Sequence, residues 1–151
     1  MIVRPGGLDH PATAALLAAH LVDMHASSPP GSVYALDLSG LATPDIAFFT
    51  AWDGDDLLGC GALRTLGDGT GEVKSMRTDP AARGRGTGQA ILDHVVGHAR
   101  AAGLTRLLLE TGTGTMFDAA HRLYARNGFV PCPPFGGHIA TAFNRFLSRP
   151  L

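Results

Sequence analysis

The chain has 151 residues, of which 45% are hydrophobic and 17% charged, and its mean hydropathy is +0.13. This composition excludes an intrinsically disordered chain and suffices for one core. A formal net charge of −1 gives no electrostatic reason to expect binding to nucleic acid or to an anionic membrane. No apolar run is long enough to span a bilayer, and Met1–Pro5 does not resemble a signal peptide. We therefore expect one cytoplasmic domain over residues 1–151.

The first third of the chain is predicted to hold a strand, a helix and a long irregular segment. Ile2–Arg4 is short, apolar and followed by Pro-Gly-Gly, which is typical of an edge strand. Asp9 is expected to cap a helix that ends near Ala26, in which apolar residues recur at helical spacing. The segment 27–44 is punctuated by Ser, Pro and Gly, which indicates a loop with room for a short helix within 33–41.

Strand patterns begin at residue 45. The apolar segments Ile46–Trp52 and Leu57–Leu66 flank an Asp-Gly-Asp turn and predict a hairpin, and Glu72–Thr78 predicts a third antiparallel strand. Helical and strand patterns then alternate: helix Gln89–Ala102, strand Arg106–Thr111, helix Phe117–Arg126, a strand from Phe129, and a last strand over Thr141–Leu147. The order β-α-(α)-β-β-β-α-β-α-β-β predicts an α/β fold, with a mixed, mostly antiparallel sheet covered by helices on both faces.

A loop rich in Gly and Arg joins the third antiparallel strand to the next helix. It contains Arg83, Gly84, Arg85, Gly86, Thr87 and Gly88. Glycines let successive backbone N–H groups converge, the helix N-terminus adds partial positive charge, and the arginines add charge-assisted hydrogen bonds. The loop lacks the third glycine of a dinucleotide fingerprint and the Gly-Lys-Ser/Thr of a Walker loop. It therefore predicts a phosphate or pyrophosphate site of another kind.

Two motifs resemble those of the GNAT superfamily of acetyl-CoA-dependent N-acetyltransferases. The acetyl-CoA signature of that family, Arg/Gln-x-x-Gly-x-Gly/Ala after a strand, is matched by Arg83, Gly86 and Gly88. A second family segment, Leu-Tyr-x-x-x-Gly-Phe, is matched by Leu123–Phe129. The order of strands and helices also fits, so the resemblance covers nearly the whole chain and implies a single-domain GNAT-like fold.

The resemblance implies where acetyl-CoA would bind as co-substrate. It is expected in a splay between the strands 72–78 and 106–111, with its pyrophosphate on the amides of residues 83–88. The backbone groups expected on its pantetheine lie near Met76, Arg77 and Thr78. Many relatives carry an Asn seven residues before the motif tyrosine, where this chain has Phe117. Phe117 is therefore expected to pack on the co-substrate instead of hydrogen-bonding it.

The resemblance and the chemistry of acetyl transfer together nominate catalytic residues. Tyr124 is expected to protonate the departing CoA thiolate, because a phenol with a pKa of about 10 is neutral at pH 7; the alternative is a packing tyrosine. An amine must lose a proton before it attacks, and Glu72 lies where several relatives carry a base. The alternative for Glu72 is an ion pair with Lys74 or Arg77. Glu110 is the rival base or an anchor for the acceptor amine; these two are the chain's only glutamates, and Lys74 is its only lysine.

The acceptor pocket of this family forms from the first loops, the hairpin and the C-terminal excursion. Residues expected to line it, beside Glu110, are Tyr34, Asp37, Phe48, Trp52, Phe135 and His138. Aromatic walls with few acids favour a small, partly apolar amine or an amino acid. Two alternatives stay open: a sensor that binds acyl-CoA without turnover, and acetylation of a protein amine. No metal site is expected, and the resemblance alone suggests a homodimer.

Overall fold

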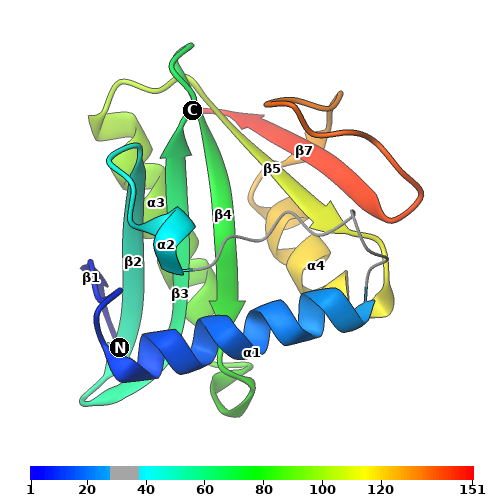
Figure 1. Ribbon diagram of the computed structural model, residues 1–151. Helices are drawn as coiled ribbons and strands as arrows, with labels where there is room; N and C mark the ends of the chain where they lie inside the picture. The colour runs from blue at the N-terminus through cyan, green and yellow to red at the C-terminus, as the bar shows by residue number, and fades with distance from the viewer. Residues whose placement is uncertain (28–37) are drawn as a thin grey trace.

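The computed structural model of the protein describes residues 1–27 and 38–151, and its element order matches the predicted one (Figure 1). The elements are β1 (Ile2–Pro5), α1 (Pro11–Ser27), α2 (Leu38–Leu41), β2 (Ile46–Asp53), β3 (Asp56–Thr65), β4 (Thr70–Thr78), α3 (Thr87–Ala101), β5 (Arg106–Gly112), α4 (Asp118–Arg126), β6 (Val130–Pro131) and β7 (Asn144–Pro150). Short 3-10 turns cover Pro80–Ala82 and Thr115–Phe117. Of the short helix predicted within 33–41, the described part is α2.

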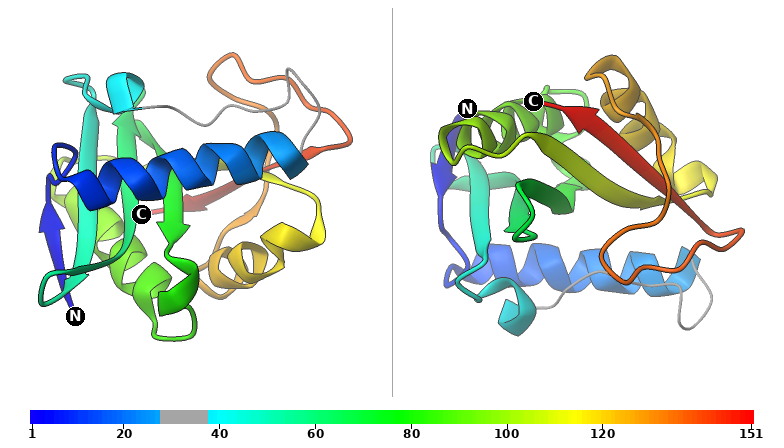
Figure 2. Two further views of the ribbon diagram at one scale, coloured as in Figure 1. Left: turned by 60° about the horizontal axis from the view of Figure 1, so that its bottom comes forward. Right: turned by 90° about the horizontal axis from the view of Figure 1, so that it is seen from above.

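The strands form one seven-stranded sheet in the order β1-β2-β3-β4-β5-β7-β6. Every neighbouring pair is antiparallel except β4 and β5, which are parallel. α1 and α2 lie on one face of the sheet, and α3 and α4 lie on the other (Figure 2). The predicted mixed, mostly antiparallel sheet with helices on both faces is therefore confirmed. No helix in the described ranges has the length and apolar character needed to cross a bilayer.

Two predicted element boundaries are wrong for local reasons. Asp9 does not cap α1: the ring Nδ1 of His10 accepts the Ala12 N–H at 3.0 Å, and so fills the cap position instead. The last strand begins at Asn144 rather than at residue 141. The Asn144 side chain accepts the Thr141 N–H at 2.8 Å and donates to the carbonyl of Ile139 at 2.9 Å, which holds this stretch in a turn.

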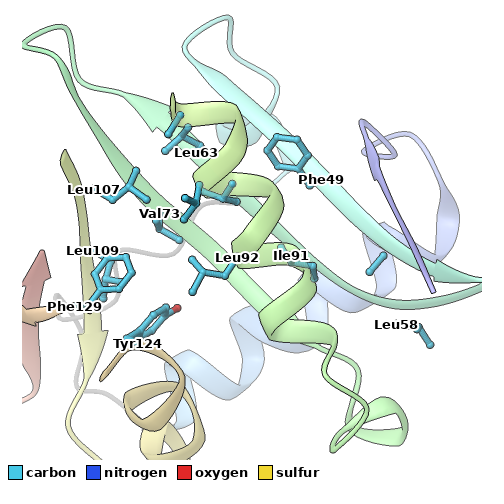
Figure 3. Close-up of a cluster of buried hydrophobic side chains, with 14 of the residues drawn as sticks. Phe49, Leu58, Leu63, Val73, Ile91, Leu92, Leu107, Leu109, Tyr124 and Phe129 are labelled. Atoms are coloured by element: carbon cyan, nitrogen blue, oxygen red, sulfur yellow. The ribbon is translucent and has the colours of Figure 1, made fainter. Parts of the chain in front are cut away.

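The main hydrophobic core lies between the sheet and α3 with α4. α3 contributes the predicted stripe of Ile91, Val95 and Ala99, all fully buried. Figure 3 shows Ile91 and Leu92 directed from α3 toward the sheet, with Tyr124 and Phe129 beside them near α4. A smaller core on the opposite face joins α1 and α2 to β2 and β3, and includes Leu17, Leu41, Phe48 and Cys60. The sheet is thus buried on both faces.

The parallel pairing of β4 with β5 covers three residue pairs, from Thr70↔Arg106 to Glu72↔Leu108. Beyond Glu72 the two strands diverge, as Figure 1 shows. The predicted splay between these strands is therefore present. It opens the middle of the sheet, so that groups from the α1 face and from the α4 face can meet there.

A β-bulge in β4 marks the point of divergence. Between the pairs Cys60↔Arg77 and Ala62↔Lys74, β3 passes one residue and β4 passes two. Within this bulge Ser75 has φ of +53°, and among the described residues no other non-glycine residue has a positive φ. An extra residue bends a strand and increases its local twist, which turns the second half of β4 away from β5.

The close packing of β3 against the β4 backbone gives a stability prediction. A Cβ added at Gly59 would lie 2.6 Å from the backbone carbonyl oxygen of Arg77 and 3.2 Å from Ile91. Because a backbone atom cannot swing aside, Gly59→Ala should lower the free energy of unfolding by about 1–3 kcal/mol, measured by urea titration.

Gly97, on the exposed side of α3, is the matched control, since nothing lies within 4 Å of its added Cβ. Gly97→Ala should raise the free energy of unfolding by up to about 1 kcal/mol, because alanine loses less backbone entropy in a helix. Equal effects of the two substitutions would contradict this account of Gly59.

Candidate active site

A cavity occupies the splay between β4 and β5. It is lined by His20 and Met24 of α1, Glu72–Met76 of β4, Glu110 and Thr111 of β5, Phe117, Ala120 and Tyr124 at α4, and His138. Because α1 and α4 lie on opposite faces of the sheet, the cavity can be lined from both sides only through the gap between the strands (Figure 2). The splay therefore brings Tyr124, Glu72, Glu110, Phe117, Met76 and His138 to one place, as the sequence predicts.

Glu72 holds a buried charge cluster in this cavity. Its side chain is 3% exposed, and its Oε2 atom lies 3.1 Å from the Nζ of Lys74 and 3.0 Å from the Nε2 of His138. The Lys74 side chain is 7% exposed. A buried carboxylate is tolerated when it is paired and hydrogen-bonded, and these two partners satisfy that requirement. The alternative of an ion pair between Glu72 and Lys74 is thus present, although inside the cavity and not on the surface.

Glu110 lines the same cavity, and one of its two carboxylate oxygens lacks a hydrogen bond among the described residues. Its Oε2 atom is buried and has no hydrogen-bond partner among the described residues. Burial raises the pKa of Glu110 above its ordinary value, opposed by the nearby charges of His138 and Lys74 and by a hydrogen bond with Asn144. A raised pKa brings a carboxylate closer to the working range of a general base at neutral pH.

His20 is a cavity residue that the sequence reasoning missed. Burial, reinforced by the positive charge of Arg77 and partly offset by Asp23, lowers the pKa of His20 to about 4. The ring is therefore neutral at pH 7, and its Nδ1 atom is buried without a partner among the described residues. Its position, four residues before Met24 on the same face of α1, is the signal that could have located it.

Tyr124 enters the cavity from the α4 side. It is 6% exposed, and its ring packs edge-on against Phe129 with centroids 5.5 Å apart. In Figure 3 its hydroxyl is directed away from α4 toward Leu92 of α3. Burial raises the pKa of Tyr124 well above its ordinary value, so the phenol keeps its proton throughout the neutral and mildly alkaline range. Tyr124 is thus a buried, protonated phenol that packs on Phe129 and lines the cavity.

The Gly/Arg loop lies at the start of α3. Gly84 and Gly86 both have φ of +79°, and Gly86 is the N-cap residue, with no side chain capping the helix. The first N–H groups of α3 therefore have no partner within the helix and face out of its N-terminus. Arg85 is held by Asp53 at 2.8 Å, and Arg83 is exposed.

These features fit the pyrophosphate of a CoA molecule. The hydroxyl of Thr87 is buried without a partner among the described residues, and a Cβ at Gly88 would lie 3.3 Å from Leu123 of α4. A side chain at Gly88 would thus crowd Leu123 where α3 approaches α4. Phe117 packs on the backbone of β5, since a Cβ at Gly112 would lie 2.2 Å from its ring.

Several residues expected at the site have other surroundings. The side chain of Arg77 is 10% exposed and paired with Asp23 of α1. Phe48 and Trp52 are buried outside this cavity, Phe48 in the core beneath α1 and Trp52 against His10. Phe135 does not line the cavity but packs on His138, with ring centroids 5.3 Å apart. Tyr34 and Asp37 lie outside the described residues.

The lowered pKa of His20 predicts how stability depends on pH. Between pH 6.5 and 4 the unfolded chain binds a proton at His20 that the folded chain does not, so the free energy of unfolding falls as pH falls through this window. The loss should approach about 3 kcal/mol at 1.36 kcal/mol per pKa unit. His20→Gln should remove this part of the slope in urea titrations from pH 7 to 4. His94→Gln, at an exposed position of α3, should keep the wild-type slope; coincident His20→Gln and wild-type slopes would contradict the assignment.

Comparison with known proteins agrees with this architecture. The model of the acetyltransferase (GNAT) family matches residues 14–129. The chain is 44% identical to the uncharacterized N-acetyltransferase YedL of Escherichia coli (strain K12), over 99% of this chain and 94% of that protein. It is 41% identical to the IAA acetyltransferase of Azospirillum brasilense, over 82% of this chain and 80% of that protein.

Solved structures share the fold over nearly the whole chain. A Klebsiella pneumoniae structure described as an acyl-CoA N-acyltransferase superposes with a TM-score of 0.83 at 27% identity, covering 99% of this chain and 97% of that one. A GNAT family acetyltransferase of Elizabethkingia anophelis, with acetyl-CoA bound, shares the fold with a TM-score of 0.69 at 17% identity, covering 99% and 97% of the two chains. The chain therefore belongs to the GNAT family of acetyltransferases.

Proposed function

We propose that the protein transfers the acetyl group of acetyl-CoA to a primary amine of a small molecule or amino acid, by direct attack while both substrates are bound. The observation that carries the proposal is the cavity in the splay, which is lined by residues from both faces of the sheet. Tyr124 reaches it from the α4 side, and Glu110 faces it with an unpartnered carboxylate oxygen. Two substrates that enter from opposite faces would meet between these groups.

The co-substrate would be held by the backbone of this chain. The N–H groups at the start of α3, with Arg83 and Arg85, would bind the pyrophosphate, and β4 from Met76 to Thr78 would bind the pantetheine. When bound, acetyl-CoA supplies an acetyl group activated as a thioester. The β4 bulge takes Ser75 and Met76 out of register with β3. The Ser75 carbonyl accepts a hydrogen bond from the Cys60 thiol at 3.4 Å, so the backbone of Met76 is proposed to face the splay.

Proton removal from the acceptor is assigned to Glu110. The pKa of an ammonium group like that of lysine lies about 3.4 units above pH 7, so very little of the amine is in the neutral, reactive form. A base at the site therefore lowers the free-energy barrier to attack. Glu72, the other carboxylate, already accepts hydrogen bonds from Lys74 and His138 on its Oε2 atom. Glu110 has the free oxygen and the raised pKa. Glu72 is proposed to orient its two partners.

Proton delivery to the leaving thiolate is assigned to Tyr124. Its burial keeps the phenol protonated until it is needed. A thiol such as that of Cys has a pKa of about 8.5, so the departing thiolate takes up a proton at pH 7, and a neutral phenol beside it can supply that proton. Tyr124 lines the cavity from the side opposite α1, which suits a group that acts on the co-substrate and not on the acceptor.

The class of acceptor rests on the size and lining of the cavity. Met24, Met76 and Phe117 give it apolar walls, while its polar groups cluster around Glu72 and Glu110. Such a lining suits a small, partly apolar amine better than an extended polycation. The name of the Azospirillum brasilense relative, an IAA acetyltransferase, is in keeping with a small-molecule acceptor.

Calorimetry and a thiol assay together test the proposal. The protein should bind acetyl-CoA in an isothermal titration, and a panel of small amines should then cause acceptor-dependent release of free CoA thiol. Gly86→Val should weaken acetyl-CoA binding, because a β-branched residue is strained at φ of +79°. Tight binding without release by any amine would favour the sensor, and absence of acetyl-CoA binding would refute both functions.

The substitution Tyr124→Phe tests whether Tyr124 is the general acid of the reaction. The substitution keeps the ring that packs on Phe129 and removes the proton donor. Loss of general acid catalysis should reduce kcat roughly 10²-fold while the affinity for acetyl-CoA stays at the wild-type value. A steady-state rate equal to that of the wild type would remove Tyr124 from this role.

A further inference from the structure

Lys74 is a buried cation that does not use all of its hydrogen-bond donors within the described residues. Its side chain is 7% exposed, and its Nζ atom makes one hydrogen bond, to Oε2 of Glu72 at 3.1 Å. An ammonium group has three N–H donors. The remaining two have no partner among the described residues, although Lys74 lines the cavity of the candidate active site. Buried donors of a charged group are costly when unsatisfied, so a ligand in the cavity that accepts from them is strongly favoured.

Other polar atoms of the same cavity also lack partners. Among the described residues, the buried unpartnered side-chain atoms include Nδ1 of His20, Oγ of Ser75 and Oε2 of Glu110, and all three residues line this cavity. Native proteins leave few such atoms, and a cluster of them in one place points to a polar ligand that completes their hydrogen bonds. The ligand must offer both acceptors, for Lys74, and a donor, for Glu110.

We propose that the acceptor is an amine that also carries a carboxylate, which Lys74 binds inside the cavity while Glu110 receives the amine. This inference rests on the proposed acetyl transfer and narrows its substrate class to amino acids and related amino carboxylates. The ammonium of Lys74 donates its two free N–H groups to the carboxylate. Glu72 holds Lys74 in place from the other side, so Lys74 is a specificity-determining residue for the reaction.

The charges of the cavity discriminate against other acceptors. A polyamine would bring a second positive charge close to Lys74, with one carboxylate already committed to that lysine. A dianionic phosphate would lie near both Glu72 and Glu110 and be repelled by them. A single carboxylate matches the ammonium of Lys74, and a single amine matches the unpartnered Oε2 atom of Glu110.

Pairs of acceptors that differ only in the carboxylate test the inference. Each amino acid that is turned over is compared with its own carboxamide, for example leucine with leucinamide, and kcat and KM are measured for wild type and for Lys74→Met. Lys74→Met should lower kcat/KM for the carboxylates roughly 10- to 100-fold, mainly through KM, as expected for a lost charge-assisted hydrogen bond. The carboxamides should change much less. Because each acceptor is compared between variants, the different amine pKa values of acid and amide cancel.

Two further variants control for folding and for nonspecific charge effects. The double variant Lys74→Met with Glu72→Gln removes both charges, so that Glu72 does not remain as a buried carboxylate without its lysine partner. It should lose the preference for carboxylates over carboxamides to the same extent as Lys74→Met alone. Arg64→Met removes a cation from an exposed ion pair with Asp45 at 3.1 Å and should keep the wild-type preference. Acetyl-CoA affinity, measured by calorimetry, should stay at the wild-type value in all three variants.

The outcomes separate the two proposals. Acetylation of amines with no preference for a carboxylate, or an equal loss for acids and amides in Lys74→Met, would overturn the assignment to Lys74 and leave the acetyltransferase standing. Binding of acetyl-CoA without turnover of any amine would overturn the proposed function and this inference with it. A preference for carboxylates that disappears in both Lys74 variants would support it.

Discussion

The short parallel pairing of β4 with β5 is the constraint on which the candidate site depends. Three residue pairs hold the strands together before the bulge at Ser75 turns β4 away. A continuous ladder would close the sheet and leave Tyr124 and Glu110 on separate faces, with no shared cavity. The divergence opens a cavity in the middle of a buried sheet, lined by residues from both of its faces.

The charged residue types that the chain uses least are concentrated in the cavity. The chain has one lysine and two glutamates, and all three line the cavity. Asp and Arg supply the other acidic and permanently basic side chains, including the exposed pairs of Arg64 with Asp45 and Arg85 with Asp53. Burying Lys74 and Glu72 together limits the desolvation cost of each. Within the described part of the chain, two N–H groups of Lys74 and the Oε2 atom of Glu110 are left without a partner, as are Nδ1 of His20 and Oγ of Ser75, and these are the groups that a substrate would satisfy.

Much of the fold follows from local sequence patterns. Apolar segments separated by glycine-containing turns located β2, β3 and β4, and the apolar stripe of α3 matched its buried face. The same patterns placed Tyr124 and both glutamates correctly on their elements, and the splay brought them together. Boundaries set by single side chains, such as the His10 cap and the Asn144 turn, leave no periodic signal. His20 was missed because a lone histidine on an amphipathic helix looks like any surface residue until the sheet beneath it is known to open. The partners of Glu72 likewise depend on the loop that carries His138.

A crystal structure of the protein with acetyl-CoA would test the central claim most directly, because it locates the co-substrate relative to the divergence of β4 and β5. We expect the thioester between these two strands, within hydrogen-bonding reach of the Tyr124 hydroxyl, and the pyrophosphate on the N–H groups at the start of α3. A coenzyme bound elsewhere, with the splay occupied by the protein's own side chains, would contradict the account.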